Sequence, residues 1–250
     1  MRHSTRYRLN TLFSSSNFPK GVKWLLISNI AIFVGMFLLA RDEQSVRGIF
    51  EWFALSPYNA IRNFRIWQLA TYLFLHGGVE HLLFNMLTLW MFGATLEKDW
   101  GTRQFLKYYF LCGIAAGVCD VTVNALLGNW YVSTIGASGA IYGVLLAFGV
   151  LYPDVNILFL FIFPIQAKYF VMIIGAMALL GAVNTSNSSV SNVAHLGGML
   201  FGLLYLKVRF PKLDMYEVRA WYRNYKLQRA KKKFQVYMRK HGSGRGPWVN

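Results

Sequence analysis

The sequence predicts an all-α integral membrane protein with six transmembrane helices. Only 14% of its residues are charged, whereas soluble domains carry about a quarter. The hydrophobic fraction is 55%, and much of it falls in apolar runs of the length that a helix needs to cross a ~30 Å hydrocarbon core. Several such runs exclude a single secretory signal peptide as the explanation.

The apolar runs place the spans at residues 22–40, 78–97, 103–123, 137–152, 167–183 and 193–208. The chain therefore divides into a basic N-terminus (1–21), a six-span membrane domain (22–208) and a basic tail (209–250).

Charge predicts the direction of the spans, because cytoplasmic loops are rich in Lys and Arg. Residues 1–23 contain five Lys or Arg and no acid, and the segment from Lys207 onward contains 13 against two acids. Segments 124–136 and 184–192 contain no Lys or Arg and should face outward. With six spans, this puts both termini in the cytoplasm. The tail is expected to form an amphipathic helix on the anionic inner leaflet. No nucleic-acid partner is expected, since no recognition motif accompanies the charge.

Residues 41–77 form a long outer segment that mixes charges with aromatic side chains. Aromatic residues favour the membrane interface, which predicts an interfacial first loop. A plain connector is the alternative. The aromatic residues are Phe50, Trp52, Phe53, Tyr58 and Trp67.

Two spans that start outside carry a polar side chain in their first turn, Ser138 in the fourth and His195 in the sixth. A helix cap or an interfacial histidine would explain either residue alone. Small residues four apart follow in both spans and would let the two helices approach closely. Ser138 and His195 would then meet as a nucleophile and its general base. The small residues are Gly139 and Gly143 in the fourth span, and Ala194, Gly198 and Gly202 in the sixth.

The second span also starts outside and carries His81 and Asn85, which lie four residues apart on one helix face. Side-chain donors beside a serine and a histidine suggest an oxyanion hole. His76 precedes the helix, and its spacing of five from His81 predicts that it points elsewhere. No HExxH motif or second ligand cluster is present, so neither a metal nor another cofactor is expected.

The chain resembles the rhomboid intramembrane serine proteases over residues 22–208. The resemblance rests on four short motifs, GxSG, AHxxGxxxG, HxxxxHxxxN and GxxxE, and on their order and placement in the spans. The matching residues are Gly136-Ala137-Ser138-Gly139; Ala194-His195 with Gly198 and Gly202; His76, His81 and Asn85; and Gly93 and Glu97.

The resemblance implies a serine endopeptidase that cleaves single-span membrane proteins near the outer face. It implies Ser138 as nucleophile and His195 as base, without a buried carboxylate. His81, Asn85 and the Ser138 amide would hold the oxyanion, and Tyr142 would pack against the His195 ring. The fifth span and the outer loop near 184–192 would move to admit the substrate.

Two features depart from the pattern or stay unexplained. Family members often carry Trp-Arg in the first loop, where this chain has Trp67-Gln68, and Asp120 in the third span has no assigned role. A non-catalytic rhomboid-like protein that binds transmembrane clients is the alternative function, and a small transporter or channel is a second one. Since no extended targeting segment precedes the first span, a prokaryotic plasma membrane is the expected location.

Overall fold

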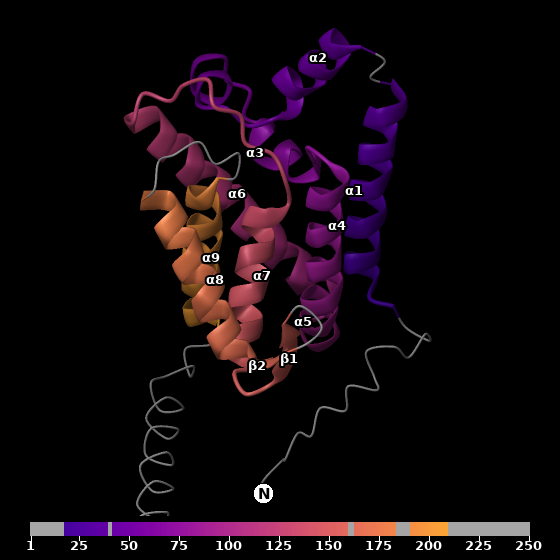
Figure 1. The fold of residues 1–250 in the computed structure, drawn as a ribbon, viewed down its shortest axis with the longest axis vertical. Helices are drawn as coiled ribbons and strands as arrows, with labels where there is room; N and C mark the ends of the chain where they lie inside the picture. The colour runs from indigo at the N-terminus through magenta and orange to yellow at the C-terminus, as the bar shows by residue number, and fades with distance from the viewer. Residues whose placement is uncertain (1–17, 40–41, 160–162, 184–190, 210–250) are drawn as a thin grey trace, which may run out of the picture. The chain divides into compact units, whose positions relative to one another are not determined.

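The computed structural model describes residues 18–39, 42–159, 163–183 and 191–209. Helices dominate these residues (Figure 1). They are α1 (Lys20–Leu39), α2 (Glu43–Phe53), α3 (Gln68–Thr71), α4 (Val79–Thr88), α5 (Ala94–Trp100), α6 (Thr102–Leu126), α7 (Ser138–Leu151), α8 (Ala167–Val183) and α9 (Asn192–Arg209). Contacts divide the chain into residues 1–205 and 206–250. The predicted basic terminus and amphipathic tail fall almost entirely outside the described residues.

Each predicted span coincides with helical structure. The second span is composed of α4, a π-helical turn at Leu89–Gly93 and α5. By length and composition, Lys20–Leu38 and Thr102–Leu126 could cross a membrane, while Ser138–Leu151 and Ala167–Val183 are shorter apolar helices.

A short hairpin between α7 and α8 departs from an all-α reading of the described residues. Strands β1 (Asn156–Phe159) and β2 (Phe163–Gln166) pair antiparallel, with Asn156 opposite Gln166. Ile157 is buried and the next residue, Leu158, is exposed, which is the two-residue alternation of a strand. The hairpin lies between the predicted fourth and fifth spans.

Helix α7 lies in the middle of the bundle, with α8 on one side and α4 on the other (Figure 1). It packs most extensively against α6. Ala140, Val144 and Ala147 on α7 have no exposed surface. A helix that is apolar around its whole circumference is suited to such a central position.

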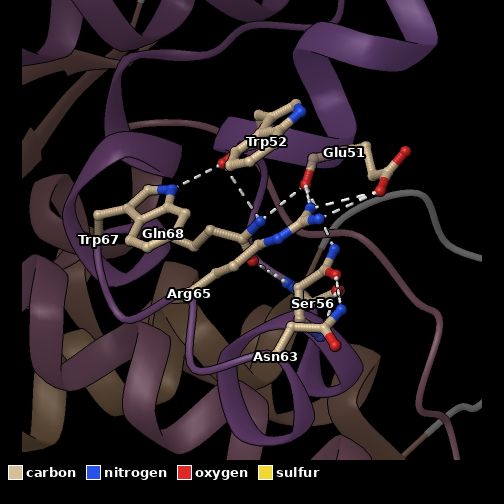
Figure 2. Close-up of polar contacts among 8 residues, drawn as sticks. Glu51, Trp52, Ser56, Asn63, Arg65, Trp67 and Gln68 are labelled. Atoms are coloured by element: carbon tan, nitrogen blue, oxygen red, sulfur yellow. Dashed lines mark hydrogen bonds and ion pairs between the residues drawn. The ribbon is translucent and has the colours of Figure 1, made fainter.

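The segment between α1 and α4 is structured rather than a plain connector. The side-chain amide of Gln68 donates to the backbone oxygens of Glu51 at 2.9 Å and Trp52 at 3.3 Å. Its oxygen accepts the backbone N–H of Ser56 at 3.4 Å. Gln68 is fully buried, so this single side chain ties the end of α2 to the start of α3 (Figure 2).

Arg65 adds a second tie to the same segment. Its guanidinium donates to the Glu51 carbonyl oxygen at 2.9 Å and lies over the Trp52 ring, 4.4 Å from the ring centroid (Figure 2). The Trp52 and Trp67 rings stack with centroids 6.1 Å apart, and the Trp67 indole donates to the Trp52 carbonyl oxygen. An arginine therefore contributes to this loop from a position three residues before Gln68.

Glu97, at the end of the second predicted span, holds the N-terminus of α1. Its carboxylate oxygens accept the backbone N–H groups of Gly21 and Val22, each at 2.7 Å, and the Thr102 hydroxyl at 2.6 Å. The first amides of a helix have no intrahelical acceptor, and a negative charge there is favourable. Glu97 is buried, so these bonds satisfy a carboxylate that would otherwise be costly.

We expect Glu97→Gln to lower the free energy of unfolding by about 1–3 kcal/mol, because a glutamine offers one acceptor oxygen in place of two. Glu43→Gln is the matched control, since Glu43 makes an exposed ion pair with Arg47 and should cost about 0.5 kcal/mol or less. Thermal unfolding in detergent micelles measures both variants. Equal effects would contradict the role given to Glu97.

Candidate active site

Ser138 and His195 meet at the N-terminal ends of two helices. Ser138 is the first residue of α7, and His195 lies in the first turn of α9. The His195 Nε2 atom lies 2.8 Å from the Ser138 Oγ atom. At this distance a neutral imidazole can accept the serine proton, provided that its own proton is on Nδ1.

Glycines bring the two helices close enough for this contact. A Cβ atom at Gly198 would overlap the carbonyl oxygen of Gly139, and one at Gly202 would lie 3.3 Å from the Gly143 Cα atom. A Cβ atom at Gly139 would lie 3.6 Å from the Ala194 carbonyl oxygen. The small residues of α7 and α9 thus face each other, as the spacing of four predicts.

Tyr142 stacks on one face of the His195 ring. The two rings stack with centroids 4.0 Å apart and planes 5° apart. Tyr142 lies one turn after Ser138 on α7, so the same helix presents both the hydroxyl and the ring that bear on His195. The imidazole is therefore held in one plane.

His81 and Asn85 of α4 lie against the residue two positions before the serine. Gly136 has a φ of 111°, which favours glycine. A Cβ atom there would lie 2.7 Å from His81 Nε2 and 3.7 Å from Asn85 Nδ2. The Gly136 amide donates to the carbonyl oxygen of Tyr72 at 2.8 Å, which fixes the turn that leads into α7.

Two buried nitrogens of Asn85 and His195 have no hydrogen-bond partner among the described residues. They are Asn85 Nδ2 and His195 Nδ1. Buried polar atoms are normally paired, so each needs an explanation. The Asn85 amide is a free donor beside the turn that leads to Ser138, and within the described chain no carboxylate is bonded to the histidine. In the same residues no group of three or more His, Cys, Asp or Glu side chains could hold a metal ion.

The prediction that His76 points away from this group is wrong. Its ring packs edge-on against that of His81, with centroids 5.0 Å apart, and it is buried. Helix α4 begins at Val79, so helical spacing does not apply to a residue in the preceding turn. Burial, with a smaller effect from His81, lowers the pKa of His76 to about 4, and the ring is neutral at pH 7.

Two tyrosines that no sequence motif indicates bond to the backbones of α6 and α7, Tyr72 to α6 and Tyr108 of α6 to α7. The Tyr72 hydroxyl donates to the Gly113 carbonyl oxygen, and the Tyr108 hydroxyl donates to that of Gly143, each at 2.7 Å. Both side chains are buried. Nothing in the local spacing indicates these contacts, since the partners lie 41 and 35 residues away.

We expect Gly198→Ala to separate α7 from α9 and to lower the unfolding temperature by several degrees, because overpacking costs about 1–3 kcal/mol or more. Gly35→Ala is the matched control, since a Cβ atom there would meet nothing within 4 Å. Thermal unfolding in micelles compares the two. An unchanged midpoint for Gly198→Ala would show that the helices are not in close contact.

Comparison with known proteins gives the same assignment as the motifs. The model of the Rhomboid domain matches residues 63–212. Rhomboid-like protease 3 of Toxoplasma gondii is 25% identical over 86% of this chain and 78% of that protein. Rhomboid protease AarA of Providencia stuartii is 28% identical over 72% of this chain and 69% of its own length. Mitochondrial Rhomboid protein 1 of Saccharomyces cerevisiae is 36% identical over 53% of this chain, which spans only 38% of that protein.

The matched domain covers more than half of the chain, and the predicted family is confirmed. At the level of the family, the relatives indicate intramembrane protease activity. The chain belongs to the rhomboid family of integral membrane proteins.

Proposed function

We propose that this protein is an intramembrane serine endopeptidase in which Ser138 is the nucleophile and His195 the general base. The observation that carries the proposal is the 2.8 Å contact between Ser138 Oγ and His195 Nε2. Serine is a weak nucleophile unless an adjacent base removes its proton. A pair of this kind, in a chain of this family, fits peptide hydrolysis better than binding alone.

In the proposed reaction, Ser138 Oγ attacks the carbonyl carbon of a peptide bond while its proton moves to His195 Nε2. His195 then gives this proton to the leaving amine, and the acyl-enzyme forms. A water molecule, deprotonated by the same nitrogen, releases the acid and restores the serine. Stacking on Tyr142 keeps the imidazole aligned through both proton transfers. In this scheme the enzyme works with a dyad.

The oxyanion of the tetrahedral intermediate would be held by His81, Asn85 and the Ser138 amide. Amides in the first turn of a helix have no intrahelical acceptor, so the Ser138 N–H is available at the start of α7. The unpaired Asn85 Nδ2 beside Gly136 is a second available donor. Donors placed in advance where charge develops are worth about 10²–10³ in kcat each.

The proposed arrangement in the membrane has six spans, both termini in the cytoplasm and the Ser138–His195 end near the outer face. The segment from α2 to α3 would lie in the interface, where its exposed Trp52, Phe64 and Trp67 suit the lipid headgroup region. The proposed location is a prokaryotic plasma membrane, and the basic tail would lie on its anionic inner leaflet.

The proposed substrates are single-span membrane proteins that enter beside α8. This helix buries only Ala167, Val171 and Ala178 and exposes Met172 and Leu180, so it is held less firmly than α7. A substrate helix that unwinds near its outer end could displace it and present an extended peptide to Ser138. Cleavage after a small residue is expected.

We expect a fluorophosphonate probe to label purified wild-type protein and neither Ser138→Ala nor His195→Ala. The probe reacts with serines that a base activates, so both partners are needed. Gel fluorescence measures labelling, and thermal unfolding verifies that each variant is folded. A folded wild-type protein that takes no label would favour the non-catalytic client-binding alternative.

Asn85→Ala should lower kcat by about 10²–10³ while KM changes little, because the lost bond forms only in the transition state. Cleavage of a reconstituted single-span substrate measures both constants. Asn63→Ala is the control, since that side chain bonds Asn59 on the exposed surface. A rise in KM with unchanged kcat would assign Asn85 to substrate binding instead.

A further inference from the structure

Asp120, buried in α6, accepts hydrogen bonds from three side chains, one on the same helix and two elsewhere in the chain. Its Oδ2 atom accepts the Thr134 hydroxyl at 2.7 Å. Its Oδ1 atom accepts the Asn124 amide at 3.1 Å and also the Ser191 hydroxyl. The residue has no exposed surface. A buried carboxylate is costly, and charge-assisted bonds of this kind offset the cost.

The bond to Ser191 reaches the helix that carries the histidine. Ser191 immediately precedes α9, and its hydroxyl oxygen accepts the backbone N–H of Ala194 at 3.1 Å. Its carbonyl oxygen accepts the backbone N–H of His195 at 3.3 Å. Ser191 therefore caps the first turn of α9, and Asp120 holds the capping hydroxyl in the orientation that leaves its lone pair for Ala194.

The bond to Thr134 reaches the segment that carries the serine. The Thr134 backbone pairs with Leu55 in both directions, at 2.8 and 3.0 Å. Two residues after Thr134, the backbone N–H of Gly136 donates to the carbonyl oxygen of Tyr72. Helix α7 begins two residues further on, at Ser138. This segment crosses between α6 and α7, so Asp120 fixes its position relative to α6.

We propose that Asp120 is a positioning residue for the Ser138–His195 pair. One carboxylate joins the residue that caps α9 to the segment that leads into α7, and so sets the distance between the two first turns. This inference rests on the proposed function for its catalytic consequence. Asp120 has no described contact with Ser138 or His195, and it acts through Ser191 and Thr134.

The third partner, Asn124, offers an internal control. It lies four residues after Asp120 on the same helix. Its bond is therefore local to α6 and connects α6 to no other element. Removing it leaves the ties to Ser191 and Thr134 in place. A role in positioning therefore predicts different results for Asn124 and for the other two partners.

The experiment compares the wild-type protein with Asp120→Ala, Ser191→Ala, Thr134→Val and Asn124→Ala in detergent micelles. We expect at least tenfold slower fluorophosphonate labelling in the first three and a change below twofold in Asn124→Ala. In substrate cleavage, kcat should fall while KM stays near its wild-type value. The double variant Asp120→Ala/Ser191→Ala should lose little more than Asp120→Ala alone, because Asp120→Ala already removes the bond to Ser191.

Hydrogen exchange provides a readout that needs no catalysis. The backbone amides of residues 192–198 should exchange at least tenfold faster in Ser191→Ala and Asp120→Ala than in Asn124→Ala or the wild-type protein. Wild-type exchange in this turn together with wild-type labelling in both variants would overturn the inference. Wild-type exchange there would overturn the anchoring of α9 even if labelling slowed.

The outcomes separate this inference from the proposed function. A wild-type protein that takes no label contradicts the protease assignment, while faster exchange in the two variants still supports the anchoring of α9 by Asp120. If Asp120→Ala does not fold, Ser191→Ala and Thr134→Val retain the carboxylate and carry the test. Normal labelling in both would then overturn the positioning role.

Discussion

The contact between α7 and α9 is the constraint on which the rest of the site depends. The two backbones approach until a Cβ atom at Gly198 would overlap the Gly139 carbonyl oxygen. Only this approach brings the serine hydroxyl to 2.8 Å from the imidazole, since both side chains are short and lie in first turns. In a membrane, where lipid is as apolar as leucine, small residues provide this close packing.

Buried polar side chains supply a second kind of connection between elements. Glu97 joins α5 to the start of α1, Gln68 joins α3 to the end of α2, and Asp120 joins α6 to the two segments that precede Ser138 and His195. Each accepts or donates several bonds to partners distant in the sequence. Polar groups away from water are costly unless paired, so such a network resists rearrangement once it has formed.

The contrast between α7 and α8 relates this rigidity to the proposed activity. Helix α7 is buried nearly all round, and α8 buries few residues and exposes most of its apolar surface. A protease for membrane helices must keep its reacting groups aligned and still admit a chain from the bilayer. The bundle meets both requirements if the tightly packed helices α7 and α9 hold the reacting groups and the peripheral helix α8 controls the entry of substrate.

The sequence by itself determined where the helices lie along the chain, and it determined the family. Each apolar run coincides with helical structure, and the first-turn positions of Ser138 and His195 follow from where α7 and α9 begin. Spacing within one helix also put His81 beside Asn85 and Tyr142 one turn from Ser138. These inferences succeed because helical geometry relates residues three and four positions apart without reference to the rest of the fold.

Only the tertiary structure decided what lies between helices. His76 contacts His81 although its spacing indicated otherwise, because the helix starts at Val79. The pairing of β1 with β2, and the bonds of Asp120 to Thr134 and Ser191, which lie 14 and 71 residues away, follow from no helical spacing. Such contacts depend on how the helices cross and where the connecting segments return, which the order of residues along one helix does not specify.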